Sequence, residues 1–251
     1  MKKLLKPICL PWITAGLGAA AFISAFWLLR TGEDSRMLLN PTHPGAILLW
    51  VLSLLMTATA LLLVQPLVKG KLRYDRAFPA SVSGAVGIGL GGAGMAFTGI
   101  NLLLSAGDPI LVANAVTALL GAAAMFYLAF CRFTGSRPHF LALCVVLVFL
   151  MLQILCRYRV WSAEPELLRY LFPMAGLMLL SLAMFQRLAF VVGMGNRWLY
   201  VLFSMLGSFF ALAALPGDND RWLLAGLCAW ALTDHCSLRV RKPRKKPEAR
   251  Q

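Results

Sequence analysis

Runs of about 20 apolar residues, separated by short polar segments, recur along the chain. A helix of about that length crosses the hydrocarbon core of a bilayer, so each run is typical of a transmembrane helix. The pattern predicts eight spans, at residues 12–29, 45–64, 80–104, 110–130, 140–156, 167–186, 198–215 and 222–238. Only 14% of the 251 residues are charged, against about 25% in soluble domains, which excludes an ordinary soluble fold. We therefore predict an all-α, polytopic membrane bundle that occupies residues 1–238 as one domain.

The amino-terminal segment has a second interpretation, as a secretory signal peptide. Lys2, Lys3 and Lys6 resemble a basic leader region, and the alanines at 19–21 resemble a cleavage site. The apolar run continues past those alanines to Leu29, which is longer than the apolar region of a signal peptide. The length of the run favours an uncleaved first helix.

The distribution of basic residues predicts the orientation of the bundle. Most of the 24 Lys and Arg residues fall at the two termini and in the loops after the second, fourth and sixth spans. Cytoplasmic loops carry such an excess of Lys and Arg. We therefore expect both termini in the cytoplasm and the chain in a prokaryotic cytoplasmic membrane.

The tail at 239–251 is basic and interrupted by proline. We expect it to be disordered and to bind anionic lipid at the cytoplasmic surface, because each basic residue there contributes about 1 kcal/mol. The predicted lipid contacts are Arg239, Arg241, Lys242, Arg244, Lys245 and Lys246. The formal net charge of +14 is explained by topology and lipid binding, so no nucleic-acid partner is expected.

The predicted span at 80–104 is unusually rich in glycine. Small residues let transmembrane helices approach closely, and Ala85, Gly89 and Ala93 recur every four residues, with Gly87 and Gly91 nearby. This pattern predicts a packing helix at the centre of the bundle. Alternatively, the glycines soften the helix for a gating movement or leave space for a ligand.

One acidic residue, Asp234, falls inside a predicted span, close to its carboxyl end. A carboxylate there is disfavoured by the helix dipole and by desolvation, so it needs a cation or a proton. Arg187, Arg132 and His235 are the candidate partners on that side. The hypotheses are a structural ion pair or a carboxylate that couples transport to a proton or cation.

Other polar residues form two layers within the predicted spans. Asn101, Asn114 and Gln153 lie toward the predicted outer face, and Gln65, Gln186 and Arg187 toward the inner one. Interhelical hydrogen bonds are their ordinary role in membranes. The alternative is a polar vestibule that opens to the exterior around Asn101, Asp108 and Asn114.

No catalytic or metal-ligating pattern is present in the sequence. The six cysteines form no CxxC pair, and the three histidines fall on different segments near the predicted membrane borders. We therefore predict neither enzymatic activity nor a cofactor. The favoured function is a small transporter or permease-type subunit, because the bundle combines a glycine-rich helix with an intramembrane acid. The alternative is a non-catalytic anchor or assembly subunit that binds a partner protein.

Overall fold

Several helices begin or end at residues that satisfy free backbone groups or suit a helix end. The computed structural model describes residues 9–32, 39–65, 71–105, 107–162, 167–218 and 220–236. Its helices are α1 (Cys9–Thr31), α2 (Pro44–Val64), α3 (Tyr74–Ala77), α4 (Val82–Leu104), α5 (Pro109–Thr134), α6 (Phe140–Trp161), α7 (Leu167–Val192), α8 (Arg197–Ala214) and α9 (Arg221–Cys236). The Asp108 side chain accepts from the Ile110 N–H at 3.1 Å, and Pro109 starts α5 without needing a donor. Gly135 ends that helix with φ +72°, a conformation that suits glycine.

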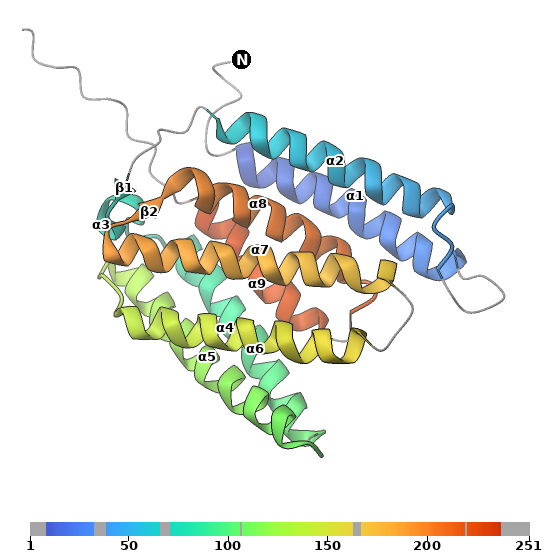
Figure 1. Cartoon of the computed structure of the whole chain (residues 1–251). Coiled ribbons are helices and arrows are strands. Elements are labelled where there is room, and N and C mark those ends of the chain that lie inside the picture. The colour runs from blue at the N-terminus through green and yellow to red at the C-terminus, as the bar shows by residue number, and fades with distance from the viewer. Residues whose placement is uncertain are drawn as a thin grey trace, which may run out of the picture.

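The long helices run back and forth between two ends of the molecule (Figure 1). Strand β1 (Lys71–Leu72) pairs antiparallel with β2 (Gly195–Asn196), and this short pair lies beside α3. We call this end the bridge end. The opposite end holds the described residues between α4 and α5 (105, 107 and 108) and between α8 and α9 (215–218 and 220), and we call it the far end.

The helices form neighbouring layers rather than a ring around one centre. The α1–α2 hairpin lies on one side and the α4–α5 pair on the other, with α7, α8 and α9 between them (Figure 1). Helix α8 is the most buried, since 67% of the residues in its apolar stretch are covered, against 44% in α4. The prediction that the glycine-rich helix is central is therefore wrong, because one side of α4, with Val82, Val86 and Leu90, faces outward.

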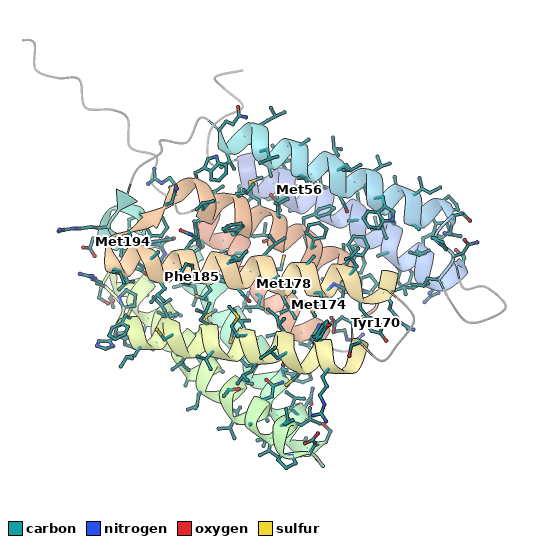
Figure 2. All side chains as sticks on the ribbon, viewed as in Figure 1. Met56, Tyr170, Met174, Met178, Phe185 and Met194 are labelled. Carbon is teal, nitrogen blue, oxygen red and sulfur yellow. The ribbon has the colours of Figure 1, made fainter. Side chains whose placement is uncertain are left out.

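The outer surface of the bundle is apolar. Side chains such as Leu54, at 71% exposed, and Leu62, at 67%, project from α2. Figure 2 shows Tyr170, Met174 and Met178 following one another along α7 from the far end. An apolar surface of this extent is unsuited to water and suits contact with lipid.

Seven of the described helices are long and apolar enough to cross a membrane. They are α1, α2, α4, α5, α6, α7 and α8, and they correspond to the first seven predicted spans. As described, α9 has 16 residues, about 24 Å at 1.5 Å per residue, and it is not among the seven. The chain is thus an all-helical bundle compatible with a multi-pass membrane protein.

Candidate functional site

The predicted polar residues are brought together in two clusters at opposite ends of the bundle. Asn114 and Gln153 meet at the far end, whereas Asp234 and Arg187 meet at the bridge end. Asn101 joins neither cluster and is exposed on α4. The backbone of His235 is in α9, but its side chain lies outside the described part of the structure.

The far-end cluster is built around Arg157. Its guanidinium group donates to Asp218 Oδ2 at 2.5 Å and Oδ1 at 3.1 Å, and to Asp220 Oδ2 at 2.9 Å. The side chains of Arg157 and Asp218 are only 8% and 5% exposed, while that of Asp220 is 29% exposed. A fork-shaped guanidinium group binds a carboxylate through two parallel bonds, so this contact fixes the α8–α9 turn against α6.

Two amides extend this cluster into the bundle. Gln153 Nε2 donates to Asp220 Oδ2 at 2.9 Å, and Asn114 Nδ2 donates to Gln153 Oε1 at 2.7 Å. The far-end cluster therefore comprises Asn114, Gln153, Arg157, Asp218 and Asp220. It joins α5, α6 and the turn before α9 by hydrogen bonds between buried and partly buried groups.

A pocket of about 200 Å³ opens beside the far-end cluster. Asn114, which lines it, is five residues past the start of α5, about 8 Å along the helix axis. The exposed Arg169 and the partly exposed Asp220 lie where the pocket reaches the surface. The lining residues are Leu102, Leu111, Asn114, Gln153, Cys156, Arg157, Arg169, Tyr170, Pro173, Gly217, Asp218 and Asp220.

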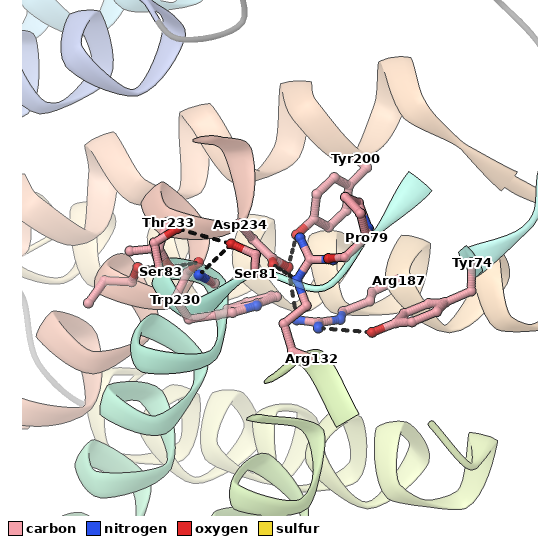
Figure 3. Close-up of polar contacts among 12 residues, drawn as sticks. Tyr74, Pro79, Ser81, Ser83, Arg132, Arg187, Tyr200, Trp230, Thr233 and Asp234 are labelled. Atoms are coloured by element: carbon pink, nitrogen blue, oxygen red, sulfur yellow. Dashed lines mark hydrogen bonds and ion pairs between the residues drawn. The ribbon is translucent and has the colours of Figure 1, made fainter. Parts of the chain in front are cut away.

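The second cluster surrounds Asp234 at the bridge end and is closed to solvent. Arg187 NH1 lies 2.9 Å from Asp234 Oδ2, and Arg132 Nε lies 3.5 Å from Oδ1, with all three side chains fully buried. The Tyr200 hydroxyl donates to Asp234 Oδ2 at 2.8 Å. Figure 3 shows these groups with Tyr74, whose hydroxyl accepts from Arg187 at 3.5 Å. Tyr74, Arg132, Arg187, Tyr200 and Asp234 form the bridge-end cluster.

Aromatic and backbone groups complete the bridge-end cluster. The guanidinium carbons of Arg132 and Arg187 lie 5.2 and 5.4 Å from the centre of the Phe78 ring, within the range of cation–π contacts. Arg132 NH1 also donates to the Pro79 carbonyl at 2.5 Å. The cluster thus ties α5, α7, α8 and α9 to the segment before α4, an arrangement suited to holding the bundle closed.

Close packing of α4 uses two of the predicted small residues, Gly87 and Gly91, together with Gly94. A Cβ atom at Gly94 would lie 2.5 Å from the Trp222 carbonyl oxygen, and one at Gly91 would lie 2.7 Å from Met125 Cε. At Gly87 an added Cβ would collide with Thr233. By contrast, a Cβ at Gly89 would meet no atom within 4 Å, and Ala93 is exposed. The row formed by Ala85, Gly89 and Ala93 therefore does not make these close contacts.

Several predictions concern residues outside the described part of the chain. The tail residues Arg239, Arg241, Lys242, Arg244, Lys245 and Lys246 are among them, so lipid binding by the tail stays a prediction. Within the described residues, no group of three or more His, Cys, Asp and Glu side chains could hold a metal ion. Cys131, Cys144, Cys156 and Cys228 are free thiols.

Sequence reasoning missed Arg157, Asp218 and Asp220 as members of a site. The signal was available, because the predicted topology places all three on the same side of the membrane and their charges are opposite. The predicted span ends at residue 156, directly before Arg157, whereas α6 continues to Trp161.

Comparison with protein-family models, with curated protein sequences and with solved structures finds no match to this chain. The two clusters differ in what their groups can contact. The bridge-end cluster is sealed, so its groups contact one another. The far-end cluster lies beside a pocket, so its groups can contact a solute.

Proposed function

We propose that the chain is a small multi-pass transporter that receives a polar solute in the far-end pocket. One observation carries the proposal: a pocket within the apolar bundle is lined by buried polar groups and by charged groups that reach its rim. Polar groups inside a membrane bundle are costly, and they mark solute pathways when they face a cavity.

In this proposal the bridge end faces the cytoplasm of a prokaryotic cell. The basic residues at 69–76, Arg137 and the tail support that orientation, because Lys and Arg accumulate in cytoplasmic loops. The far-end pocket then opens to the exterior, and α9 forms the eighth membrane segment, which returns the carboxyl terminus to the cytoplasm.

The two clusters supply the parts of an alternating-access cycle. The pocket reaches solvent at the far end, while the bridge-end cluster closes the opposite end. Release on the cytoplasmic side requires the contacts of Asp234 with Arg187 and Arg132 to separate. These ion pairs then serve as a gate between α9 on one side and helices α5 and α7 on the other.

Uptake by proteoliposomes tests the proposal. The purified protein is reconstituted, exposed to a defined mixture of polar metabolites, and the lumen is analysed by mass spectrometry. We expect at least one solute to accumulate several-fold over protein-free liposomes, and Gln153→Met to abolish that accumulation because it breaks the hydrogen-bonded cluster beside the pocket.

The matched control is Gln186→Met on α7. Gln186 accepts from the Asn196 N–H at 3.4 Å near the bridge end, away from the pocket. It should leave accumulation unchanged. Equal accumulation in protein-free and protein-containing liposomes, with inserted and folded protein, would contradict transport.

A second candidate function, an assembly subunit, is supported by a lateral groove between α4 and α9. The groove has a volume of about 460 Å³ and is lined by Leu90, Ala93, Gly94, Phe97, Trp222, Ala225, Gly226 and Ala229. Small residues on an outer face permit close approach of a partner helix. Recovery of a stoichiometric partner after purification in mild detergent, lost when Ala93 is replaced by Trp, would favour this alternative.

A further inference from the structure

Every NH₂ group of the far-end cluster donates at least one hydrogen bond to a carboxylate or an amide of the cluster. Both terminal nitrogens of Arg157 donate to Asp218 or Asp220. Gln153 Nε2 donates to Asp220, and Asn114 Nδ2 donates to Gln153. The donors of the cluster are thus partly used within it, and each amide NH₂ group keeps a second N–H.

One buried acceptor in the pocket has no hydrogen-bond partner among the described residues. It is the side-chain oxygen of Asn114, a residue that is 2% exposed and lines the pocket. A buried polar atom without a partner is costly, and native structures contain few of them. The Asn114 oxygen can therefore accept a hydrogen bond from a ligand in the pocket.

The orientation of both amides is fixed by Asp220. A carboxylate only accepts hydrogen bonds, so Gln153 must direct its NH₂ group to Asp220 and its oxygen to Asn114. Asn114 must then direct its own NH₂ group to Gln153. The Asn114 side-chain oxygen is consequently the atom left without a hydrogen-bond partner in the described part of the chain. Rotating either amide by 180° would place two acceptors or two donors against each other.

The charge of the cluster matches a cationic ligand. Asp218 and Asp220 contribute two negative charges and Arg157 one positive charge, which leaves a net charge of −1. Arg169 also lines the pocket, but it is exposed, so solvent weakens its repulsion of a cation. The nearby pair of Arg159 and Asp108 is exposed and neutral in sum.

We propose that the far-end pocket binds a small primary ammonium compound, whose N–H groups donate to the Asn114 oxygen and whose charge is balanced by Asp220. The inference rests on the proposed function only in taking this pocket as the solute site. The pocket volume of about 200 Å³ is below the roughly 300–1,000 Å³ of drug-sized sites, so the ligand is a small one.

Thermal unfolding of the full chain in detergent, at constant ionic strength, tests the inference. The probes are n-butylammonium chloride, tetramethylammonium chloride and sodium butyrate. We expect butylammonium to raise the unfolding temperature in a saturable way. Tetramethylammonium carries the same charge without an N–H donor, and butyrate carries the opposite charge, so each should require at least tenfold higher concentration for the same effect.

Two variants connect the effect to the pocket. Asn114→Leu removes the acceptor, and Asp220→Asn removes one charge while keeping an oxygen that accepts from Gln153. Each should weaken butylammonium binding about tenfold, or about 1.4 kcal/mol. The control Asn101→Leu alters an exposed asparagine of α4 outside the pocket and should bind as wild type does.

The inference is overturned if wild-type protein shows no saturable effect of butylammonium, or if tetramethylammonium or butyrate is equally effective. It is also overturned if Asp220→Asn binds butylammonium as wild type does, and this variant decides the matter if Asn114→Leu fails to fold. Butylammonium binding without solute uptake would leave the inference standing and contradict transport. Uptake of a solute without an ammonium group, with no amine binding, would overturn the inference alone.

Discussion

At the residue scale, Asp234 is the residue whose charge matters most to the folded bundle. Its carboxylate is fully buried between Arg187 and Arg132. Removing one partner from such a cluster leaves buried charge without compensation, which costs about 3–5 kcal/mol. We therefore expect Asp234→Asn to lower the free energy of unfolding in detergent by several kcal/mol and to reduce the amount of protein in the membrane.

Asp108→Asn is the matched control for this change. Asp108 pairs with Arg159 at 3.5 Å, but the two side chains are 46% and 65% exposed, and exposed pairs contribute at most about 1 kcal/mol. Asparagine also keeps the cap on the Ile110 N–H. An Asp234→Asn protein as stable and abundant as Asp108→Asn would contradict a structural role, and if its uptake alone were lost, Asp234 would be a coupling carboxylate.

The sequence alone identified the charged residues of the bridge-end cluster, but not the aromatic residues that contact them. Asp234 and its two arginines were named because a carboxylate within an apolar run needs a cation. Tyr200 and Tyr74 were not named, since tyrosine near a membrane border is ordinarily an interfacial anchor. Arg157 was excluded from the span because hydropathy counts its charge, although Asp218 neutralises it in the fold.

At the element scale, the contact between α4 and α9 depends on glycines at specific positions. Gly94→Ala would place a methyl group 2.5 Å from the Trp222 carbonyl oxygen, so the two helices must separate. We expect Gly94→Ala to lower the unfolding temperature. Gly89→Ala meets no neighbouring atom and should leave stability unchanged or raise it by up to about 1 kcal/mol, the helix-propensity difference between the two residues.

Both variants carry the same substitution on the same helix, so their difference reports packing alone. Thermal unfolding in one detergent measures it. If Gly94→Ala were as stable as Gly89→Ala, the close approach of α4 and α9 would be contradicted.

Hydropathy also located the long helices but not all of their ends or faces. The first seven spans match because an apolar run of that length has few alternatives to a helix in lipid. Helices α5 and α7 continue beyond the predicted ends at 130 and 186, since charged residues there are paired inside the bundle. The packing face of α4 depends on where α9 lies. The spacing of small residues along α4 alone does not determine that position.

At the scale of the whole molecule, the two ends of the bundle differ in kind. The bridge end is closed by buried ion pairs and by the β1–β2 pair, and the far end carries a pocket of about 200 Å³. This asymmetry is what a transporter open to one side requires. Transport as proposed therefore requires that the far-end pocket be accessible from the exterior.

Labelling of Cys156 tests that central claim most directly. Cys156 lines the far-end pocket, so a variant is made in which the other cysteines, Cys9, Cys131, Cys144, Cys228 and Cys236, are serine. A membrane-impermeant maleimide is then applied to intact cells and to inside-out vesicles. The account predicts modification in intact cells and protection in the vesicles. Modification only in the vesicles, or only after denaturation, would contradict an outward-facing pocket.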